Sequence, residues 1–274
     1  MTAPAHVLVF DSGVGALSII AEIKHHLPQC TITFASDNAF FPYGEKEENV
    51  LIDRVDTVLK HLEQRYQPNI IVVACNTAST VALPKVRSHF KIATVGVVPA
   101  IRPAAKISQS RVIGLLATPG TVRRQYTQDL IQEFASDCLI ISVGSTELVN
   151  QAERKLRGQP VDHRVFEEVL ATIFEADRGS EVDTIVLACT HFPLLKDELI
   201  AASPRKVAWV DSGEAIAKRV AYWIEEHQLA PSETRYRSVV ITTPDKAFEV
   251  ENHTPLHHFL NQLLPGPIET ITVP

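Results

Sequence analysis

The segments VVACNTAST (residues 72–80) and VLACTHFPL (residues 186–194) follow the same pattern. Each is a run of apolar residues that ends in Ala-Cys and continues into small polar residues. Apolar runs without alternating polar residues are typical of strands buried on both faces of a parallel sheet. The pattern therefore predicts two such strands, with Cys75 and Cys189 at their carboxyl ends.

The rest of the chain alternates between short apolar runs and stretches with helical spacing. Helical spacing occurs, for example, at residues 17–26, 49–66 and 163–177. Strands that alternate with helices indicate an α/β fold with parallel sheets. The remaining apolar runs are HVLVFD (6–11), TITFAS (31–36), TVGVV (94–98), RVIGLLAT (111–118), CLIISVG (138–144), KVAWVD (206–211) and SVVITT (238–243).

The segment KVAWVDSGEAIAKRV (206–220) echoes the opening HVLVFDSGVGALSII (6–20). This echo predicts that the chain returns to its first sheet near residue 207. We therefore expect two parallel-sheet α/β domains. The first comprises residues 1–98 together with 208–274, and the second comprises residues 99–207. A cleft between two such domains is a favoured place for a ligand, so we expect the active site there.

The composition is that of an ordinary globular protein, with 45% hydrophobic and 21% charged residues among 274. A formal net charge of -6 argues against nucleic acid or an anionic membrane as the main partner. No apolar run approaches the ~20 residues of a membrane span, and the N-terminus lacks the basic region of a signal peptide. We expect a cytoplasmic protein. A homodimer is compatible with the chain, although the sequence reveals no interface.

The four cysteines are widely spaced and include no Cys-x-x-Cys pair, so neither a disulfide framework nor a zinc site is indicated. Cys30 and Cys138 each precede an apolar run, and we interpret them as packing residues. Cys75 and Cys189 differ, because functional groups in open α/β sheets gather beyond the carboxyl ends of strands. A zinc site would need more ligands than Cys75, Cys189 and His191 provide.

The residues after the two strand-end cysteines are suited to begin helices. Asn76 or Thr77, and Thr190, are residue types that cap helix N-termini. A helix N-terminus lowers the pKa of a thiol, and its free N–H groups can bind a carboxylate. Two thiols on opposite faces of a chiral carbon could remove a proton from one face and return one to the other. His191 could take up or supply the proton.

Three further segments supply candidate site residues. DSGVGALS (11–18) follows a strand and contains Gly-x-Gly, but it lacks the third glycine of a dinucleotide loop, so nucleotide binding is the weaker interpretation. The alternative is that Asp11 and Ser12 line the cleft. FFPYGEK (40–46) forms a turn that could present Tyr43 and Gly44. In LLATPGTVRRQY (115–126), Thr118 or Thr121 could cap a helix.

Seven motifs, taken together and in order, resemble those of glutamate racemases of the aspartate/glutamate racemase superfamily. The resemblance runs from residue 7 to about residue 225. It implies a cofactor-independent enzyme that interconverts L- and D-glutamate and supplies D-glutamate for bacterial peptidoglycan. The motifs are DSGVG (11–15), FPYGEK (41–46), VACNTAS (73–79), GVVPAI (96–101), GT (120–121) before VRRQY, ACTHFPLL (188–195) and DSGEAIA (211–217).

The resemblance also implies roles for individual residues. Cys75 would act on the D-enantiomer and Cys189 on the L-enantiomer, assisted by Asp11 and His191 respectively. No metal is implied. Glu153 is a candidate acidic residue, but the sequence around it matches poorly. The substrate would be held by Asp11, Ser12, Tyr43, Gly44, Asn76, Thr77, Thr121, Thr190 and His191.

Two positions depart from the family pattern: Ala16 stands where a glycine is common, and Arg124 where a serine is common. An arginine at that position could lie at the rim of the cleft. Three other hypotheses remain open from the residues. They are an aspartate or hydantoin racemase, a two-domain protein that binds a dicarboxylate without turnover, and a nucleotide-dependent enzyme that uses the Asp11 loop.

Overall fold

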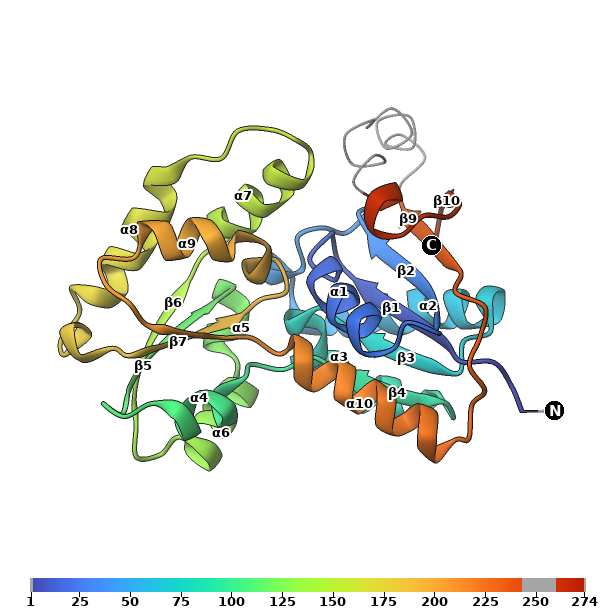
Figure 1. The fold of residues 1–274 in the computed structure, drawn as a ribbon, viewed down its shortest axis with the longest axis horizontal. Helices are drawn as coiled ribbons and strands as arrows, with labels where there is room; N and C mark the ends of the chain where they lie inside the picture. The colour runs from blue at the N-terminus through green and yellow to red at the C-terminus, as the bar shows by residue number, and fades with distance from the viewer. Residues whose placement is uncertain (1, 243–259, 274) are drawn as a thin grey trace.

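The computed structural model describes residues 2–242 and 260–273, which form two α/β units side by side (Figure 1). Each unit is built on a parallel sheet. The expected fold class, two parallel-sheet α/β domains, is confirmed. Within the described residues no helix is both long and apolar enough to cross a membrane.

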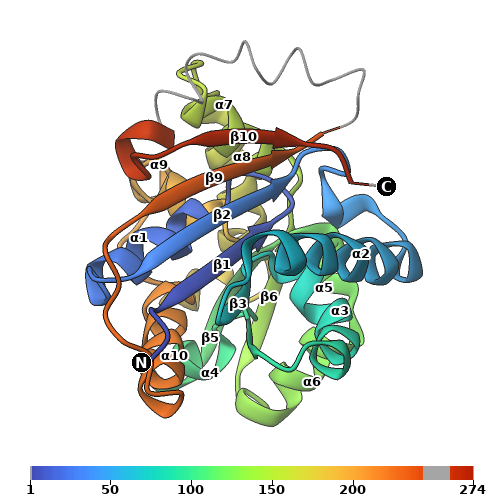
Figure 2. The ribbon, with the colours of Figure 1, turned by 90° about the vertical axis from the view of Figure 1, so that its right-hand side faces the viewer.

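The first sheet has six strands in the order β10-β9-β2-β1-β3-β4. Its central strands are apolar on both faces, and Val7, Leu8 and Val9 of β1 are fully buried. Helices α1 and α10 cover one face, and α2 and α3 cover the other (Figure 2). The strands are β1 (His6–Asp11), β2 (Thr31–Asp37), β3 (Ile70–Val73), β4 (Ala93–Gly96), β9 (Tyr236–Ile241) and β10 (Ile268–Ile271), and the helices are α1 (Leu17–His26), α2 (Glu48–Tyr66), α3 (Asn76–His89) and α10 (Gly213–Glu226).

The second sheet has four strands in the order β6-β5-β7-β8. Its two faces are covered by α4 and α6 on one side and by α7, α8 and α9 on the other. The strands are β5 (Val112–Ala117), β6 (Leu139–Gly144), β7 (Thr184–Ala188) and β8 (Ala208–Val210). The helices are α4 (Ile101–Ile107), α5 (Pro119–Arg123), α6 (Gln125–Phe134), α7 (Glu147–Leu156), α8 (His163–Phe174) and α9 (Lys196–Ala202), with short 3₁₀ turns η1 (Tyr43–Glu45), η2 (Gly179–Glu181) and η3 (Phe192–Leu195).

The prediction that KVAWVD (206–211) joins the first sheet is wrong. Residues 208–210 form β8, which pairs in parallel with β7 of the second sheet. The chain returns to the first unit only afterwards, through α10, which packs beside α1. The two similar segments therefore have one thing in common: the helices that follow them, α1 and α10, pack against each other. Their strands, β1 and β8, belong to different sheets. The expected span 208–274 also includes residues 243–259, which lie outside the described residues.

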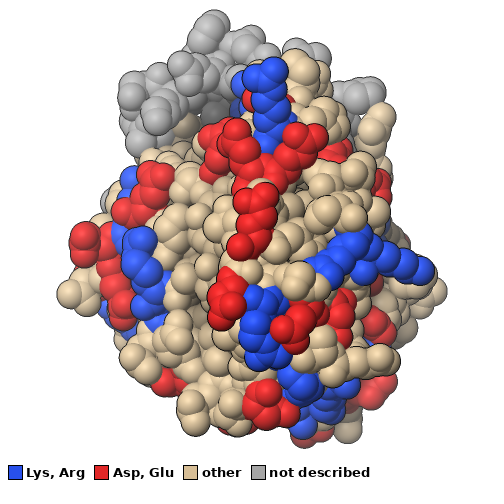
Figure 3. All heavy atoms as spheres, turned by 90° about the vertical axis from the view of Figure 1, so that its left-hand side faces the viewer, with Lys and Arg blue, Asp and Glu red and all other residues tan. Residues whose placement is uncertain are grey.

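The outer face of the second unit carries interspersed charges of both signs. Figure 3 shows lysine and arginine side chains next to aspartate and glutamate side chains there, without a broad basic surface. Nucleic-acid binding relies on a continuous basic patch that neutralises phosphates. This face therefore lacks the continuous basic patch of a nucleic-acid-binding surface.

Candidate active site

The carboxyl ends of strands from both sheets converge on one small cavity between the two units. β1 ends at Asp11, β3 leads into Cys75, and β7 leads into Cys189. The cavity measures about 20 Å³, enough for about one water molecule, which needs ~10–15 Å³ on the same measure. A larger ligand therefore requires the lining to move outward. The lining residues are Ser12, Phe41, Pro42, Tyr43, Gly44, Glu45, Cys75, Asn76, Thr77, Thr118, Thr146, Val149, Cys189, Thr190 and His191.

The thiol of Cys75 lies in an acidic corner of the cavity. Its Sγ is 3.8 Å from Ser12 Oγ, and the Ser12 N–H donates a 2.6 Å hydrogen bond to Asp11 Oδ1. Burial, and then the negative charge of Asp11, raise the pKa of Cys75 well above its usual value. The Ala78 N–H at the start of α3 lowers this pKa as expected, but burial and the neighbouring carboxylate outweigh it.

The start of α3 also differs in detail from the sequence prediction. Cys75 itself occupies the N-cap position, and Asn76 and Thr77 are the first two helical residues. On the other side, Thr190 precedes the 3₁₀ turn η3, whose N-cap is His191. Pro193 lies in the first turn of η3. Both cysteines still lie immediately before a helical turn.

The thiol of Cys189 lies beside a histidine and a glutamate. Its Sγ is 3.8 Å from His191 Nδ1, and His191 Nε2 is 3.0 Å from Glu153 Oε1. Burial opposes the charged form of His191, but hydrogen bonds and charge interactions with Cys189 and Glu153 raise its pKa well above the usual value. Burial also opposes the charged form of Glu153, yet His191, the Val14 N–H and Arg157 lower its pKa to about 2. The Cys189 thiol and the Glu153 carboxylate thus favour the imidazolium form of His191.

Hydrogen bonds join the two halves of the site across the cleft. The Thr190 hydroxyl donates to Asp11 Oδ2 over 2.9 Å, and the Val14 N–H donates to Glu153 Oε1 over 3.0 Å. Glycines make this approach possible. A Cβ at Gly13 would lie 2.6 Å from Glu153 Oε1, and a Cβ at Gly15 would lie 2.5 Å from Thr190 Oγ1. The DSGVG loop thus lets second-unit side chains approach its backbone.

Three threonine hydroxyls form a buried cluster at one end of the cavity. Thr77 Oγ1 is 3.1 Å from Thr118 Oγ1 and 3.3 Å from Thr121 Oγ1. Thr118 also caps α5, because its side chain accepts a hydrogen bond from the Thr121 N–H. Thr121 lies behind the lining and contacts it through Thr77. The cluster brings hydroxyls from both units to one place.

Tyr43 and Asn76, two other predicted residues, differ in whether their polar side-chain atoms already have a hydrogen-bond partner. The Tyr43 hydroxyl donates a 2.6 Å hydrogen bond to Asp37 Oδ2, so it is already engaged. Burial and the charge of Asp37 raise the pKa of Tyr43 well above its usual value. Asn76 Oδ1 is buried and has no hydrogen-bond partner among the described residues. It remains available to a polar ligand.

The structure thus gathers the predicted residues at one site, with Asp11 and Thr121 just behind the lining. The sequence analysis missed Phe41, Pro42, Glu45, Thr146 and Val149 of the lining and gave too little weight to Glu153. The α7 residues carry no local motif, because their place in the site depends on long-range packing. Within the described residues no group of three or more His, Cys, Asp or Glu side chains could hold a metal ion.

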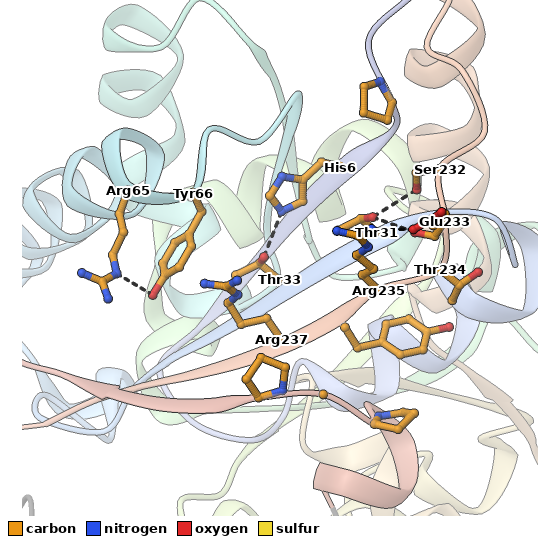
Figure 4. A pocket seen from close by; sticks show the side chains of 15 residues that line it. His6, Thr31, Thr33, Arg65, Tyr66, Ser232, Glu233, Thr234, Arg235 and Arg237 are labelled. Atoms are coloured by element: carbon orange, nitrogen blue, oxygen red, sulfur yellow. Dashed lines mark hydrogen bonds and ion pairs between the residues drawn. The ribbon is translucent and has the colours of Figure 1, made fainter.

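A larger hollow, of about 840 Å³, lies at the amino-terminal ends of β2 and β9 (Figure 4). Arg65, Arg235 and Arg237 line it. Each is already paired with a carboxylate, Arg65 and Arg237 with Glu269 and Arg235 with Glu233. No cysteine lines this hollow. The small cavity at the carboxyl ends is therefore the candidate active site.

Comparison with known proteins identifies the class of protein. Residues 17–220 match the Asp/Glu/hydantoin racemase family. The match covers most of the chain, and it includes the strand-end cysteines and the histidine described above. The chain belongs to this family, and the expectation of an enzyme of the racemase class is confirmed.

Within the family, the chain is similar to glutamate racemases. The glutamate racemase of Escherichia coli O139:H28 (strain E24377A / ETEC) is 49% identical over 222 residues, which are 81% of this chain and 77% of that protein. A crystal structure of Escherichia coli glutamate racemase in complex with L-glutamate and the activator UDP-MurNAc-Ala is 42% identical, with 99% of both chains covered and a TM-score of 0.89. The Thermus thermophilus glutamate racemase in complex with β-chloro-D-alanine is 28% identical, with 99% and 97% covered and a TM-score of 0.77. The resemblance noted in the sequence is confirmed.

Proposed function

We propose that this chain is a cofactor-independent racemase that interconverts L- and D-glutamate with two cysteines. The observation that carries the proposal is that Cys75 from the first unit and Cys189 from the second line the same cavity. One thiolate takes the proton from Cα, and the electron pair of the broken C–H bond stays on carbon. The thiol on the opposite face then gives its proton to that carbon, which inverts the centre.

The environments of the two thiols support an assignment of their roles. The resemblance to glutamate racemases implies that Cys189 acts on the L-enantiomer, and the His191 imidazolium beside it favours the thiolate that this step needs. Glu153 holds that imidazolium in place from its far side. Cys75 has a raised pKa and is the thiol that donates in this direction. In the reverse direction the two cysteines exchange roles.

Asp11 assists Cys75 in this scheme. Burial raises the pKa of Asp11 above its ordinary value, although His191 and the hydrogen bond from Thr190 oppose the shift. A carboxyl group with a raised pKa can accept a proton and return it. Ser12 lies between Asp11 and the Cys75 sulfur, with contacts to both. Asp11 is therefore placed to stabilise Cys75 as a thiol or to help deprotonate it.

The remaining polar groups suit a dicarboxylic amino acid. Free N–H groups at the start of α3 can bind a carboxylate, and the buried Asn76 Oδ1 can accept a hydrogen bond from an ammonium group. Hydroxyls and backbone groups supply the other contacts. We assign substrate binding to Asp11, Ser12, Tyr43, Gly44, Asn76, Thr77, Thr121, Thr190 and His191.

The choice of glutamate rests on the similarity to glutamate racemases, one of which is 49% identical. On this basis we propose that the product, D-glutamate, is supplied in the cytoplasm for peptidoglycan synthesis. Aspartate is the second candidate, because the family includes racemases for both amino acids. The site chemistry supports either dicarboxylate.

The proposal is tested with purified protein and L-glutamate in D2O without added cofactor. We expect the optical signal to decay to zero while proton NMR shows loss of the Cα–H signal and its replacement by deuterium. Decay of the optical signal with L-aspartate but not with L-glutamate would support the two-cysteine mechanism and identify aspartate as the substrate. A constant optical signal with both amino acids would overturn the proposal.

A further inference from the structure

Arg124 lies where the two units meet at the edge of the cavity. It follows α5 and precedes α6, and its guanidinium is largely buried, with 11% of the side chain exposed. A Cβ built on Gly120 would be 3.2 Å from Arg124 Nη1 and 2.7 Å from the Gly44 carbonyl oxygen. Gly44 lines the cavity. Arg124 Nη1 therefore lies at the seam between α5 and the cavity-lining turn η1.

The guanidinium of Arg124 has few polar partners for its N–H groups among the described residues. Nη1 is buried and has no hydrogen-bond partner among the described residues. Nε is 3.9 Å from Glu48 Oε2, at the start of α2 in the other unit, and the Glu48 side chain is 61% exposed. This distance is too long for a hydrogen bond. Arginine stays charged even where burial lowers its pKa, so a buried cation here lacks a strong partner.

A ligand carboxylate at this site would need a cation that is not already paired with a protein carboxylate. The two cations described above, His191 and Arg157, are both paired with Glu153 already. A dicarboxylic amino acid brings two carboxylates and one ammonium group, hence one net negative charge. Arg124 supplies a fixed positive charge at the edge of the same cavity, and an arginine with a free N–H suits a carboxylate.

We propose that Arg124 recruits the substrate by exchanging its loose contact with Glu48 for a carboxylate of the incoming dicarboxylic amino acid. In the structure, Glu48 of the first unit faces Arg124 of the second. When the cleft opens, the exposed Glu48 turns to water, and the guanidinium is left to attract the ligand. Arg124 is thus a binding residue for the reaction proposed above, on which this inference rests.

Competition between Glu48 and the substrate for Arg124 can be distinguished from a purely structural Arg124–Glu48 ion pair. If the pair only held the units together, Arg124→Gln and Glu48→Gln would change substrate affinity in the same direction. If Glu48 competes with the substrate, the two substitutions act in opposite directions. Arg124→Gln weakens binding, whereas Glu48→Gln strengthens it.

The test measures kcat and KM for L-glutamate, and the Kd for L-glutamate by calorimetry, in matched variants. We expect Arg124→Gln to raise KM and Kd about tenfold or more, the size of one charge-assisted hydrogen bond, with a much smaller change in kcat. Glu48→Gln should lower both constants, and Arg124→Lys should restore part of the affinity. Arg123→Gln, an exposed arginine next in sequence, is the control and should leave both unchanged.

Two results would overturn this inference. One is an unchanged KM and Kd in Arg124→Gln, and the other is a shift of Arg124→Gln and Glu48→Gln in the same direction. Calorimetry needs no turnover, so it tests Arg124 even if the wild-type protein fails to racemise glutamate. That failure alone would count against the proposed function. The titrations would then be repeated with L-aspartate, and an unchanged Kd in Arg124→Gln would overturn the role of Arg124 in binding.

Discussion

The Thr190 hydroxyl donates a 2.9 Å hydrogen bond to Asp11 Oδ2, and this bond crosses from one unit to the other. Asp11 is the last residue of β1 and lies beside Cys75, and Thr190 follows Cys189 directly. The bond therefore connects the surroundings of the two thiols in the closed form. It also holds Asp11 in the orientation in which its other oxygen accepts from the Ser12 N–H.

Asp11→Asn should lower kcat about 10²-fold or more, the usual contribution of a positioned acid or base, with a smaller change in KM. The amide keeps the shape of the side chain but cannot take up a proton. Steady-state kinetics in both directions check this. Asp211→Asn, in the second DSG segment, is the matched control and should retain activity. A large rise in KM at unchanged kcat would instead make Asp11 a binding residue.

Glu153→Gln should shift the alkaline limb of the kcat profile to lower pH. Glu153 is one of the groups that raise the pKa of His191, so its neutralisation lets the imidazolium lose its proton at lower pH. Glu147→Gln changes an exposed glutamate on the same helix and is the control. A pH profile of Glu153→Gln that coincides with the wild-type profile would contradict the proposed role of the pair.

The same carboxylate gives the protein a pH-dependent stability. The pKa of Glu153 falls from 4.5 to about 2 on folding, so its contribution is present above pH 4.5 and is lost as the pH falls towards 2. A shift of this size corresponds to about 3 kcal/mol. Urea unfolding at pH 6 and pH 3 should show a smaller loss of the free energy of unfolding in Glu153→Gln than in the wild type. Equal losses in both proteins would contradict the shift.

Gly15→Ala should impair closure of the cleft. The added Cβ would lie 2.5 Å from Thr190 Oγ1 and 2.6 Å from His191 Nδ1, so the second unit must move away. A misplacement of about 1 Å at an active site can cost about 10²-fold in rate. We expect kcat/KM to fall by that order, with a nearly unchanged Tm because each sheet stays intact. Wild-type kcat/KM would show that the close approach is unnecessary.

Asp37→Asn should destabilise the first unit. Asp37 is fully buried and receives hydrogen bonds from Arg54 at 2.8 Å and from the Tyr43 hydroxyl at 2.6 Å. Weakening a buried ion pair from one side costs about 3 kcal/mol or more. Asp53→Asn, which alters an exposed pair with Lys85, should cost at most about 1 kcal/mol. Urea unfolding distinguishes the two, and equal effects would contradict this account.

Sequence patterns located the site where the signal was local. Cys75 and Cys189 follow uninterrupted apolar runs, and parallel strands bring their carboxyl ends to one edge, so the meeting of the thiols could be anticipated. Glu153 could not be placed in the same way. It reaches His191, 38 residues along the chain, only because α7 packs against η3, the turn that follows β7 and Cys189.

Two errors have physical causes of the same kind. The segment at 208–210 has the apolar pattern of a strand, and its echo of the N-terminus predicts the first sheet. It pairs with β7 instead, because the packing of the whole second unit decides its partner. The position of Cys75 before a helix predicts a lowered pKa. In the folded chain, burial and Asp11 dominate, and both are properties of the tertiary structure.

The most direct test of the two-thiol account is deuterium exchange by the single variants Cys75→Ser and Cys189→Ser. Each variant is incubated in D2O with L-glutamate and, separately, with D-glutamate, and Cα exchange and optical rotation are followed. The account predicts no racemisation by either variant. Cys75→Ser, which retains Cys189, should exchange only the L-enantiomer, and Cys189→Ser only the D-enantiomer. Racemisation at the wild-type rate by either variant, or exchange of both enantiomers by one variant, would contradict it.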